Sequence, residues 1–255
     1  MTKDLVNVAN RNLASTFTKG LDVLNCFESG RSDLSMADIA HLTGFDRATS
    51  RRLCLTLEAA GYLVKSGRIY RLSPRVVAVA GGYLSSHEIG KSVQPTLNQF
   101  AEELNGEIAL VVRDGTRAIY IARSAVSSAR LSLGLSIGST LPLLPTAVGR
   151  CLLANCPPEL RQSLIEECEL NRHTETTDMD KSSILAKIET SAREGYALVI
   201  SEFEQGAAGV AVPTTRIGDT EAVLATSTTA NQVENATQLN KITDTLRRAS
   251  LSLRA

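Results

Sequence analysis

One short motif in this sequence could supply a catalytic nucleophile. Residues 134–138, Gly-Leu-Ser-Ile-Gly, fit the G-x-S-x-G pattern of serine hydrolases, and His173 lies downstream. A serine nucleophile of this kind needs a strand, a sharp turn and then a helix. Apolar residues instead alternate with small ones from Leu131 to Gly138, which predicts a half-buried strand over Arg130 to Ile137. The pattern therefore argues against a hydrolase, and no enzymatic activity is expected.

The histidines and cysteines lack the spacing of a metal or redox site. The three histidines fall in separate segments without an H-x-x-x-H or C-x-x-C partner, so no metal and no cofactor is expected. The cysteines are Cys26, Cys54, Cys151, Cys156 and Cys168. Their odd number and apolar surroundings favour reduced, buried thiols. A redox-active pair of Cys151 and Cys156 is the alternative, although only Arg150 stands near either thiol as an activating cation.

A cluster of basic and hydroxylated side chains has the chemistry of a DNA-reading surface. Its members on one predicted helix are Arg47, Thr49, Ser50, Arg51 and Arg52, and those around the following hairpin are Lys65, Arg68 and Arg71. Arginine can bond guanine with two N–H groups, hydroxyls can contact bases or phosphates, and a helix N-terminus favours a phosphate. The alternative is a solvated basic helix in a domain that binds proteins. The coincidence of helix, hairpin and basic charge favours DNA.

The elements that position this cluster form a predicted winged helix-turn-helix. An amphipathic helix over Phe17 to Glu28 comes first. A capping box at Ser35 to Asp38 then opens a short helix that Thr43-Gly44 ends. Asp46 is the expected N-cap of the next helix, which Gly61 terminates. Two β-rich segments around Ser66-Gly67 complete the motif as a hairpin, the wing.

Charge is distributed unevenly along the 255 residues. The whole chain carries 27 basic and 27 acidic residues, but residues 1–80 contain 11 basic against 7 acidic ones. The basic excess therefore lies in the segment with the predicted helix-turn-helix, where a DNA partner requires it. The sequence has no apolar run of membrane-spanning length and no apolar signal-peptide core, so we expect a cytoplasmic protein without a membrane partner.

The remainder of the chain predicts an α+β domain with a mostly antiparallel sheet, because strands and helices mix without strict alternation. Strands are expected at Ile108 to Val112, Ala118 to Ala122, Ala197 to Ile200, Gly209 to Pro213 and Glu221 to Thr228, besides the one over Arg130 to Ile137. Helices are expected at Thr146 to Ala154, Pro158 to Cys168, Lys181 to Glu194 and Ala236 to Leu253.

Several segments together resemble the IclR family of bacterial transcriptional regulators over nearly the whole chain. The helix-turn-helix carries Leu34-Ser-Met-Ala-Asp-Ile-Ala40 and Thr43-Gly-Phe-Asp-Arg-Ala-Thr-Ser-Arg-Arg-Leu53, and Leu57 to Tyr62 follow. Leu141 to Arg150 are similar to the family's LPLHATALGKA segment, with Arg150 in place of its lysine. The resemblance implies a winged helix-turn-helix joined to a GAF-like effector-binding domain, and a homodimer or homotetramer that binds double-stranded operator DNA.

Within the family, the chain looks most like regulators of protocatechuate, 4-hydroxybenzoate and β-ketoadipate catabolism. The family's effector pocket maps onto Leu133, Leu141, Thr146, Ala147, Val148, Gly209, Thr226 and Thr228. Free N–H groups at the helix start near Thr146 can receive a carboxylate, and Thr226 and Thr228 share one strand face and offer hydroxyls. The alternative is that these are small core residues. Val199 and Gly209 stand where a glyoxylate-responsive member carries an acid and a thiol, which favours a larger or aromatic acid.

The expected organisation is therefore a DNA-binding domain over residues 1–74, a helical linker over 75–92 and an effector-binding domain over 93–255. The apolar residues of the linker, Val76 to Leu84, exceed what a lone helix can bury, which favours an oligomer. The competing interpretation is a ligand-binding enzyme with a vestigial winged domain. The sequence leaves open the effector, the operator, activation versus repression, and dimer versus tetramer.

Overall fold

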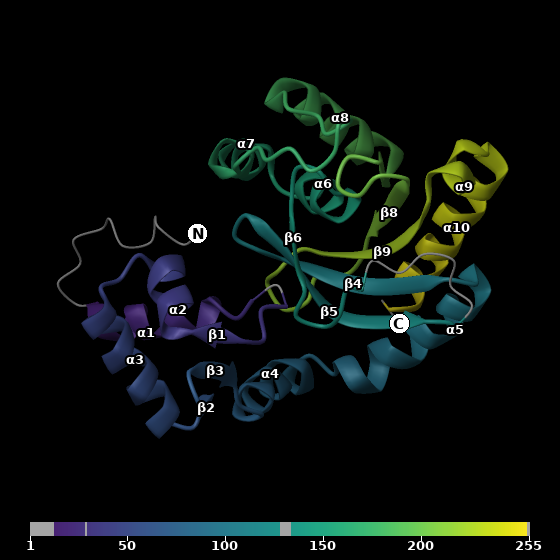
Figure 1. Cartoon of the computed structure of the whole chain (residues 1–255). Coiled ribbons are helices and arrows are strands. Elements are labelled where there is room, and N and C mark those ends of the chain that lie inside the picture. Colours follow the sequence, from purple (N-terminus) through teal and green to yellow (C-terminus); the bar gives the residue numbers. More distant parts are fainter. Residues whose placement is uncertain (1–12, 29, 128–133, 254–255) are drawn as a thin grey trace. The chain divides into compact units, whose positions relative to one another are not determined.

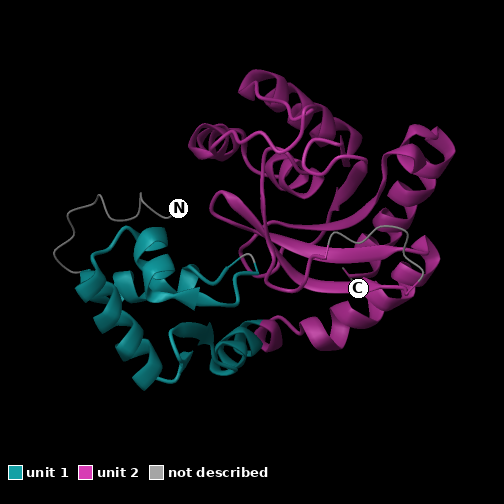
Figure 2. Ribbon diagram, viewed as in Figure 1, with its two compact units in different colours: residues 1–83 teal, residues 84–255 magenta. Residues whose placement is uncertain are grey.

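The computed structural model describes residues 13–28, 30–127 and 134–253, which fall into two compact units. Unit 1 covers residues 1–83 and unit 2 covers residues 84–255 (Figure 2). Each unit has a hydrophobic core of its own.

In unit 1, three helices pack with a small antiparallel sheet, and most of α4 (Arg75–Ser86) follows them (Figure 1). Its elements are α1 (Ser15–Asn25), β1 (Leu34–Ser35), α2 (Met36–Thr43), α3 (Arg47–Ala59), β2 (Leu63–Ser66) and β3 (Ile69–Leu72). The strand order is β1-β3-β2, so the β2–β3 hairpin is held to the helices through β1. Val23, Ile39, Cys54 and Leu63 are almost completely buried between these elements. The expected helix-turn-helix with a wing is confirmed.

Local sequence explains where the two central helices begin. The Ser35 side chain accepts a hydrogen bond from the Asp38 N–H, and Asp38 accepts one from the Ser35 N–H, which is the capping box that the sequence indicates. Gly44 ends α2 with φ +71°, a backbone conformation that side chains disfavour. The Asp46 side chain then accepts from the Thr49 N–H and caps α3. These signals fix the turn between the helices.

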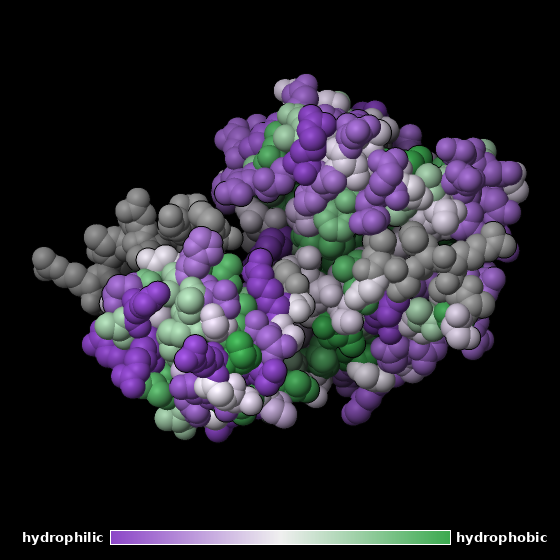
Figure 3. Space-filling model, viewed as in Figure 1, coloured by the Kyte–Doolittle hydropathy of each residue, from purple (hydrophilic) through white to green (hydrophobic). Residues whose placement is uncertain are grey.

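Helix α4 (Arg75–Ser86) follows the wing and buries none of its residues within the chain. Val77 and Val79 are 71% and 60% exposed, and Tyr83 is 41% exposed. Figure 3 shows hydrophobic surface of this kind among the polar residues of the face in view. An amphipathic helix with an exposed apolar side is unusual for a monomer.

Unit 2 is built on one six-stranded antiparallel sheet with helices on both faces (Figure 1). The strand order is β6-β5-β4-β9-β8-β7. The strands are β4 (Glu107–Asp114), β5 (Arg117–Ala125), β6 (Thr140–Pro142), β7 (Ala197–Ile200), β8 (Ala207–Pro213) and β9 (Ala222–Thr229). The helical segments are η1 (Ile89–Val93), α5 (Gln94–Leu104), α6 (Ala147–Ala154), α7 (Pro158–Glu167), α8 (Lys181–Glu194), α9 (Ala230–Glu234) and α10 (Ala236–Ser252). The expected α+β class is confirmed.

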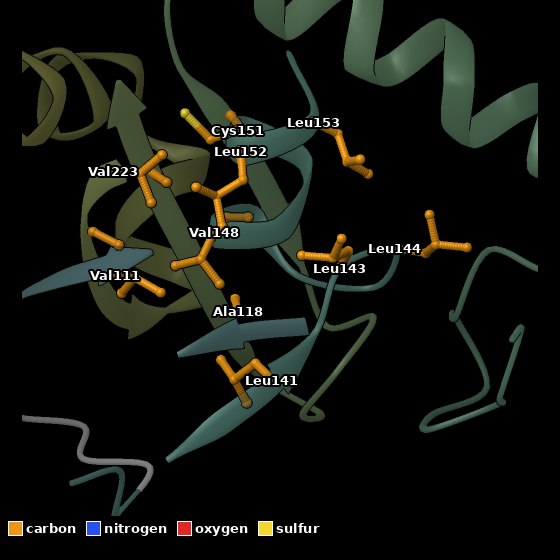
Figure 4. Close-up of a cluster of buried hydrophobic side chains, with 14 of the residues drawn as sticks. Val111, Ala118, Leu141, Leu143, Leu144, Val148, Cys151, Leu152, Leu153 and Val223 are labelled. Carbon is orange, nitrogen blue, oxygen red and sulfur yellow. The ribbon is translucent and has the colours of Figure 1, made fainter. Parts of the chain in front are cut away.

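Strand alternation divides the core of unit 2 into two layers. Val111, Val223 and Ala225 lie on the face that α6 covers, whereas Leu110 and Leu224 lie on the face that α5 and α10 cover. Figure 4 shows the first layer, with Val148 and Leu152 of α6 between the helix and the strands. The side of the sheet on which a residue falls therefore decides whether it meets α6.

Gly149 lets α6 lie against the segment that precedes it. A Cβ atom at this position would lie 2.1 Å from the carbonyl oxygen of Leu143 and 2.2 Å from its Cα atom. These are backbone atoms, which cannot move aside as a flexible side chain can. Glycine at this position is therefore required by close packing.

The strand expected over Arg130 to Ile137 is wrong for its described part. Residues 134–139 form no strand; Ile137 and Gly138 lie in a turn, and Gly134 and Gly138 have φ of +67° and +89°. The Ser139 N–H bonds the Ser136 carbonyl, which closes a turn and exposes Ile137. Two glycines in the left-handed region break the strand that alternation alone predicts. Residues 130–133 lie outside the described residues, and the next strand, β6, begins at Thr140.

The thiols agree with the expectation of buried, reduced cysteines. All five are free and buried. Burial raises the pKa of Cys54 and of Cys168 to about 11, so neither thiol ionises near neutral pH. Among residues 13–28, 30–127 and 134–253, no group of three or more His, Cys, Asp or Glu side chains could hold a metal ion. No helix in the same part of the chain is long and apolar enough to cross a membrane.

We predict that Gly149→Ala lowers the free energy of unfolding by about 3 kcal/mol, because the backbone of Leu143 must shift to admit the methyl group. Gly90→Ala is the matched control in the same unit, since a Cβ atom there meets nothing within 4 Å. Urea unfolding followed by circular dichroism measures both. Equal unfolding midpoints for the two variants would contradict the packing role of Gly149.

Candidate functional site

Unit 1 has a hollow, here called the basic groove, between the start of α2, one side of α3 and the wing. It is lined by Ser35, Met36, Ala37, Arg47, Arg51, Leu55, Lys65, Gly67, Arg68 and Tyr70. Arg47, Arg51 and Leu55 stand four residues apart and so share one side of α3. The wing adds Lys65 and Arg68. The fold therefore brings four of the eight sequence-predicted cationic and hydroxylated side chains together in one concave surface.

The α3 N-terminus is organised by Asp46. Its carboxylate accepts hydrogen bonds from the Thr49 N–H at 2.9 Å and from the Thr49 hydroxyl at 2.7 Å. The Thr49 N–H and hydroxyl hold the pKa of Asp46 below its ordinary value, and Arg52 contributes less. The cap remains ionised at neutral pH, and the first turn of α3 is fixed with Arg47 exposed beside it.

The expectation that Ser50 contacts DNA is wrong. Its side chain is completely buried, and its hydroxyl donates to the Asp46 carbonyl at 3.0 Å. Position 50 faces the core because it lies three residues before Leu53 on the buried side of α3. Thr49 is half-buried and donates its hydroxyl to Asp46, so only its acceptor lone pairs remain for a partner.

Two other predicted cations lie outside the basic groove. Arg52 is exposed on α3 but does not line the groove, and Arg71 forms an ion pair with Asp33. Met36 and Ala37 contribute the first turn of α2 to the groove and were not among the residues expected from the sequence. The capping box at Ser35 is the signal that could have found them, because it marks a helix N-terminus with free N–H groups.

Unit 2 has a second hollow, here called the sheet hollow, between α6, the sheet and the β7–β8 loop. Its empty volume is about 470 Å³, including its open mouth. The lining residues are Tyr120, Leu141, Pro145, Thr146, Ala147, Val148, Val199, Ser201, Glu202, Phe203, Glu204, Ala207, Ala208, Gly209, Val210, Ala225, Thr226 and Ser227. Of the predicted effector residues, Leu141, Thr146, Ala147, Val148, Gly209 and Thr226 line this hollow. Leu133 lies outside the described residues.

The N-terminus of α6 is the polar wall of the sheet hollow. Thr146 caps the helix by accepting from the Gly149 N–H at 3.2 Å, and its own hydroxyl donates to the Pro142 carbonyl at 2.7 Å. The N–H groups of Ala147 and Val148 lie in the first turn, so they have no carbonyl acceptor within the helix. They offer donors and the positive end of the helix dipole to an anion.

Gly209 sets how closely α6 approaches the sheet. A Cβ atom on Gly209 would come within 3.1 Å of the Ala147 Cβ. A larger residue on β8 would therefore press on the helix start that lines the hollow. This close approach is the physical reason for a glycine at this position.

The Thr226 and Thr228 hydroxyls, which were expected to bond a ligand, are bonded within the chain instead, although Thr226 lines the sheet hollow. Both lie on the same face of β9 as Leu224, the face that α5 and α10 cover. The Thr226 hydroxyl donates to the Glu107 carbonyl at 2.6 Å, and the Thr228 hydroxyl donates to Gln232. Ser227 is the residue of this strand end that faces the sheet hollow. Counting the alternation from Ala225, which packs beneath α6, could have identified it.

A buried ion pair joins α6 to the β7–β8 loop, which forms the other wall of the hollow. Arg150 is 2% exposed, and its NH1 and NH2 groups bond the two carboxylate oxygens of Glu202 at 2.9 and 2.6 Å. The Nε of Arg150 donates to the Leu144 carbonyl at 2.7 Å. Two N–H groups of one guanidinium thus bond both oxygens of one carboxylate, which the single ammonium group of lysine cannot do in this geometry. The pair neutralises Glu202, so the hollow can accept an anion despite a carboxylate in its wall.

A second set of hydrogen bonds fixes the same loop from its outer side. The Thr174 and Thr176 hydroxyls donate to the Ser201 carbonyl, and the Thr177 hydroxyl donates to the Glu202 carbonyl, all at 2.6 to 2.7 Å. Ser201 is held at φ +56°, which is unusual for a residue with a side chain. The His173 ring lies 5.0 Å from that of Phe203. These contacts fix the β7–β8 loop in place as one wall of the hollow.

Asp178 extends this network to α8. Burial alone raises the pKa of its carboxyl, but hydrogen bonds from Lys187, Ser183 and the Asp180 N–H hold that pKa at about 2. Its own N–H donates to Glu202 at 3.1 Å, and Lys187 lies 2.8 Å from Asp178 and 3.4 Å from Glu202. The charges of Glu202 and Asp178 are therefore balanced by Arg150 and Lys187.

Two family models match the chain. Residues 81–255 match the bacterial transcriptional regulator IclR C-terminal family, and residues 16–67 match the IclR helix-turn-helix domain. The family resemblance read from the sequence is confirmed by these matches.

The relatives of this chain include regulators that are named for aromatic catabolism. The Pca regulon regulatory protein of Pseudomonas putida is 34% identical over 78% of this chain and 68% of its own length. The p-hydroxybenzoate hydroxylase transcriptional activator of Acinetobacter baylyi is 30% identical over 92% of this chain and 89% of its own. These names match the branch that the sequence motifs indicate.

Solved structures agree with both units. An IclR family transcriptional regulator from Brucella abortus superposes with a TM-score of 0.80 at 25% identity, over 98% of this chain and 94% of that one. A double mutant of the Acinetobacter PobR inducer-binding domain, in complex with 3-hydroxybenzoic acid, gives a TM-score of 0.58 at 28% identity. That match covers 65% of this chain and 97% of the domain.

We predict that removing either partner of the Arg150–Glu202 pair lowers the free energy of unfolding by about 3 to 5 kcal/mol, because the other charge stays buried without a counterion. The measurement is urea unfolding of Arg150→Met, Glu202→Leu and the double variant. The double variant should lose clearly less stability than the sum of the single losses. Simple additivity would show that the two charges do not depend on each other.

Proposed function

Because this chain belongs to the IclR family of bacterial transcriptional regulators, we propose that it reads its operator with the basic groove of unit 1. Arg47 and Arg51 stand on the exposed side of α3 and are the proposed base contacts. Lys65 and Arg68 on the wing are the proposed phosphate contacts. Arg52, Thr49 and Arg71 are not proposed as main DNA contacts. None of them lines the groove, and Thr49 and Arg71 are bonded to Asp46 and Asp33. The observation that carries this proposal is the convergence of four cations on one concave surface.

We further propose that the effector is a small aromatic carboxylate that binds in the sheet hollow. The N–H groups of Ala147 and Val148 receive its carboxylate, while Leu141 and Phe203 cover its apolar body and Ser227 bonds a remaining polar group. The names of the relatives support protocatechuate, 4-hydroxybenzoate or the ring-cleavage product β-ketoadipate. Glu202 is bonded to Arg150 and is not available as a general base. The family assignment likewise leaves no support for an enzyme with a vestigial winged domain.

The proposed assembly is a homodimer or homotetramer that acts in the cytoplasm. Its DNA-binding domain is residues 1–74, its linker residues 75–92 and its effector-binding domain residues 93–255. The support for self-association is α4, which exposes Val77 and Val79 and buries no residue within the chain. Paired recognition helices then read half-sites about 34 Å or a multiple of that apart.

We expect Arg51→Ala to weaken operator binding by about 1 to 3 kcal/mol and to reduce discrimination between operator and unrelated DNA, because it removes a proposed base contact. The double variant Lys65→Ala, Arg68→Ala should weaken binding to operator and to unrelated DNA by the same factor. It should also reduce the salt dependence of both affinities. Gel-shift titrations use the DNA upstream of the protein's own gene. Arg193→Ala, an exposed arginine on α8, is the control and should behave as the unmodified protein. Wild-type affinity in Arg51→Ala would refute the proposed groove.

Calorimetry with the three named acids tests the effector proposal. We expect at least one acid to bind with a dissociation constant below about 1 mM, and operator DNA to change that affinity, since linkage between the two sites is reciprocal. Ser227→Ala should weaken binding, whereas Thr228→Val should not, because Thr228 faces the opposite side of the sheet. A loss in Thr228→Val with none in Ser227→Ala would contradict the proposed pocket.

A further inference from the structure

The floor of the sheet hollow contains the phenol side chain of Tyr120. Tyr120 on β5 is 3% exposed and lines the hollow, on the same sheet face as Ala118 and Val111. Its N–H donates to the Ser139 carbonyl and its carbonyl accepts from the Gly138 N–H, which fixes the main chain. Its hydroxyl makes no hydrogen bond within the residues that the structure describes.

A buried hydroxyl without a partner is uncommon, because burying it unbonded costs free energy. Among the described residues, Thr214 has the one side-chain oxygen that is both shut off from solvent and unpaired. The Tyr120 hydroxyl is unpaired but not shut off, although almost all of the residue is buried. Because Tyr120 lines the sheet hollow, we assign the open space at its hydroxyl to this hollow.

The surroundings of Tyr120 keep its hydroxyl neutral. Burial raises its pKa above the ordinary value and the nearby Glu107 carboxylate adds to this, while Arg123 acts in the opposite direction. The group is thus an O–H donor that also has lone pairs to accept. It suits a hydroxyl of a ligand, which can donate and accept in the same way.

Besides the Ser201 and Ser227 side chains, the hollow presents an anion site and an uncharged phenol hydroxyl to a ligand. The N–H groups of Ala147 and Val148 form an anion site, and the Tyr120 hydroxyl is an uncharged partner. Leu141, Val199 and Phe203 supply apolar surface. A ligand that satisfies all of these carries a carboxylate, an apolar body and a separate hydroxyl.

We infer that Tyr120 is a specificity-determining residue, which bonds the ring hydroxyl of the effector and so selects hydroxylated aromatic acids over benzoate. This inference rests on the proposed effector site. It adds a residue and a selection rule to that proposal. A site that leaves a buried hydroxyl unpaired rejects the ligand that lacks the matching group.

The test is calorimetry of the full chain and of Tyr120→Phe with 4-hydroxybenzoate, protocatechuate and benzoate. The unmodified protein should bind at least one hydroxylated acid about 10-fold or more tightly than benzoate. In Tyr120→Phe that preference should fall to about 2-fold or less, with benzoate affinity unchanged. Tyr196→Phe, which removes a phenol hydroxyl outside the sheet hollow, is the matched control and should keep the preference.

Thermal unfolding without ligand separates recognition from a structural role. Because the Tyr120 hydroxyl has no partner within the described chain, Tyr120→Phe should keep the unfolding midpoint or raise it. A lowered midpoint would assign the hydroxyl to folding and overturn the inference. An unchanged preference in Tyr120→Phe would overturn it while leaving the effector proposal intact. If no acid binds the unmodified protein, the effector proposal fails and the inference fails with it.

Discussion

The ion pair between Arg150 and Glu202 is the constraint on which the sheet hollow depends. It joins α6, whose first N–H groups are the proposed anion site, to the loop that forms the opposite wall, and both side chains are almost completely buried. Taking two charges out of water is costly unless each finds its counterion and its hydrogen bonds. Here both conditions are met, and Lys187 supports the carboxylate further. One interaction thereby fixes the wall and neutralises the Glu202 carboxylate beside the proposed effector site.

The second constraint is the alternation of side chains along each strand, which places neighbouring residues on opposite faces of the sheet. Neighbours along β9 face different helices, so Ser227 reaches the sheet hollow whereas Thr226 and Thr228 bond Glu107 and Gln232 on the other side. Gly209 and Gly149 complete the arrangement by letting α6 approach both β8 and its own preceding segment. The hollow is therefore a consequence of helix packing as much as of its polar residues.

The DNA-binding unit follows a simpler logic. Caps at Ser35 and Asp46 fix where the two helices begin, and the helical period then directs Arg47 and Arg51 to one side and Ser50 to the core. The wing contributes Lys65 and Arg68 to the same surface. Recognition in this unit needs only local signals and a short hairpin. For this reason it could be predicted from the sequence more fully than the effector site.

The sequence by itself determined the family, the α+β class, the helix-turn-helix with its caps and most strands, since these depend on periodicity and on residues close together in the chain. It misplaced the strand over Arg130 to Ile137, because apolar alternation does not reveal the left-handed glycines at 134 and 138. Only the tertiary structure paired Arg150 with Glu202, 52 residues apart, and brought Tyr120 to the floor of the same hollow. Contacts between distant segments depend on sheet register and helix packing. No local pattern in the chain encodes either of these.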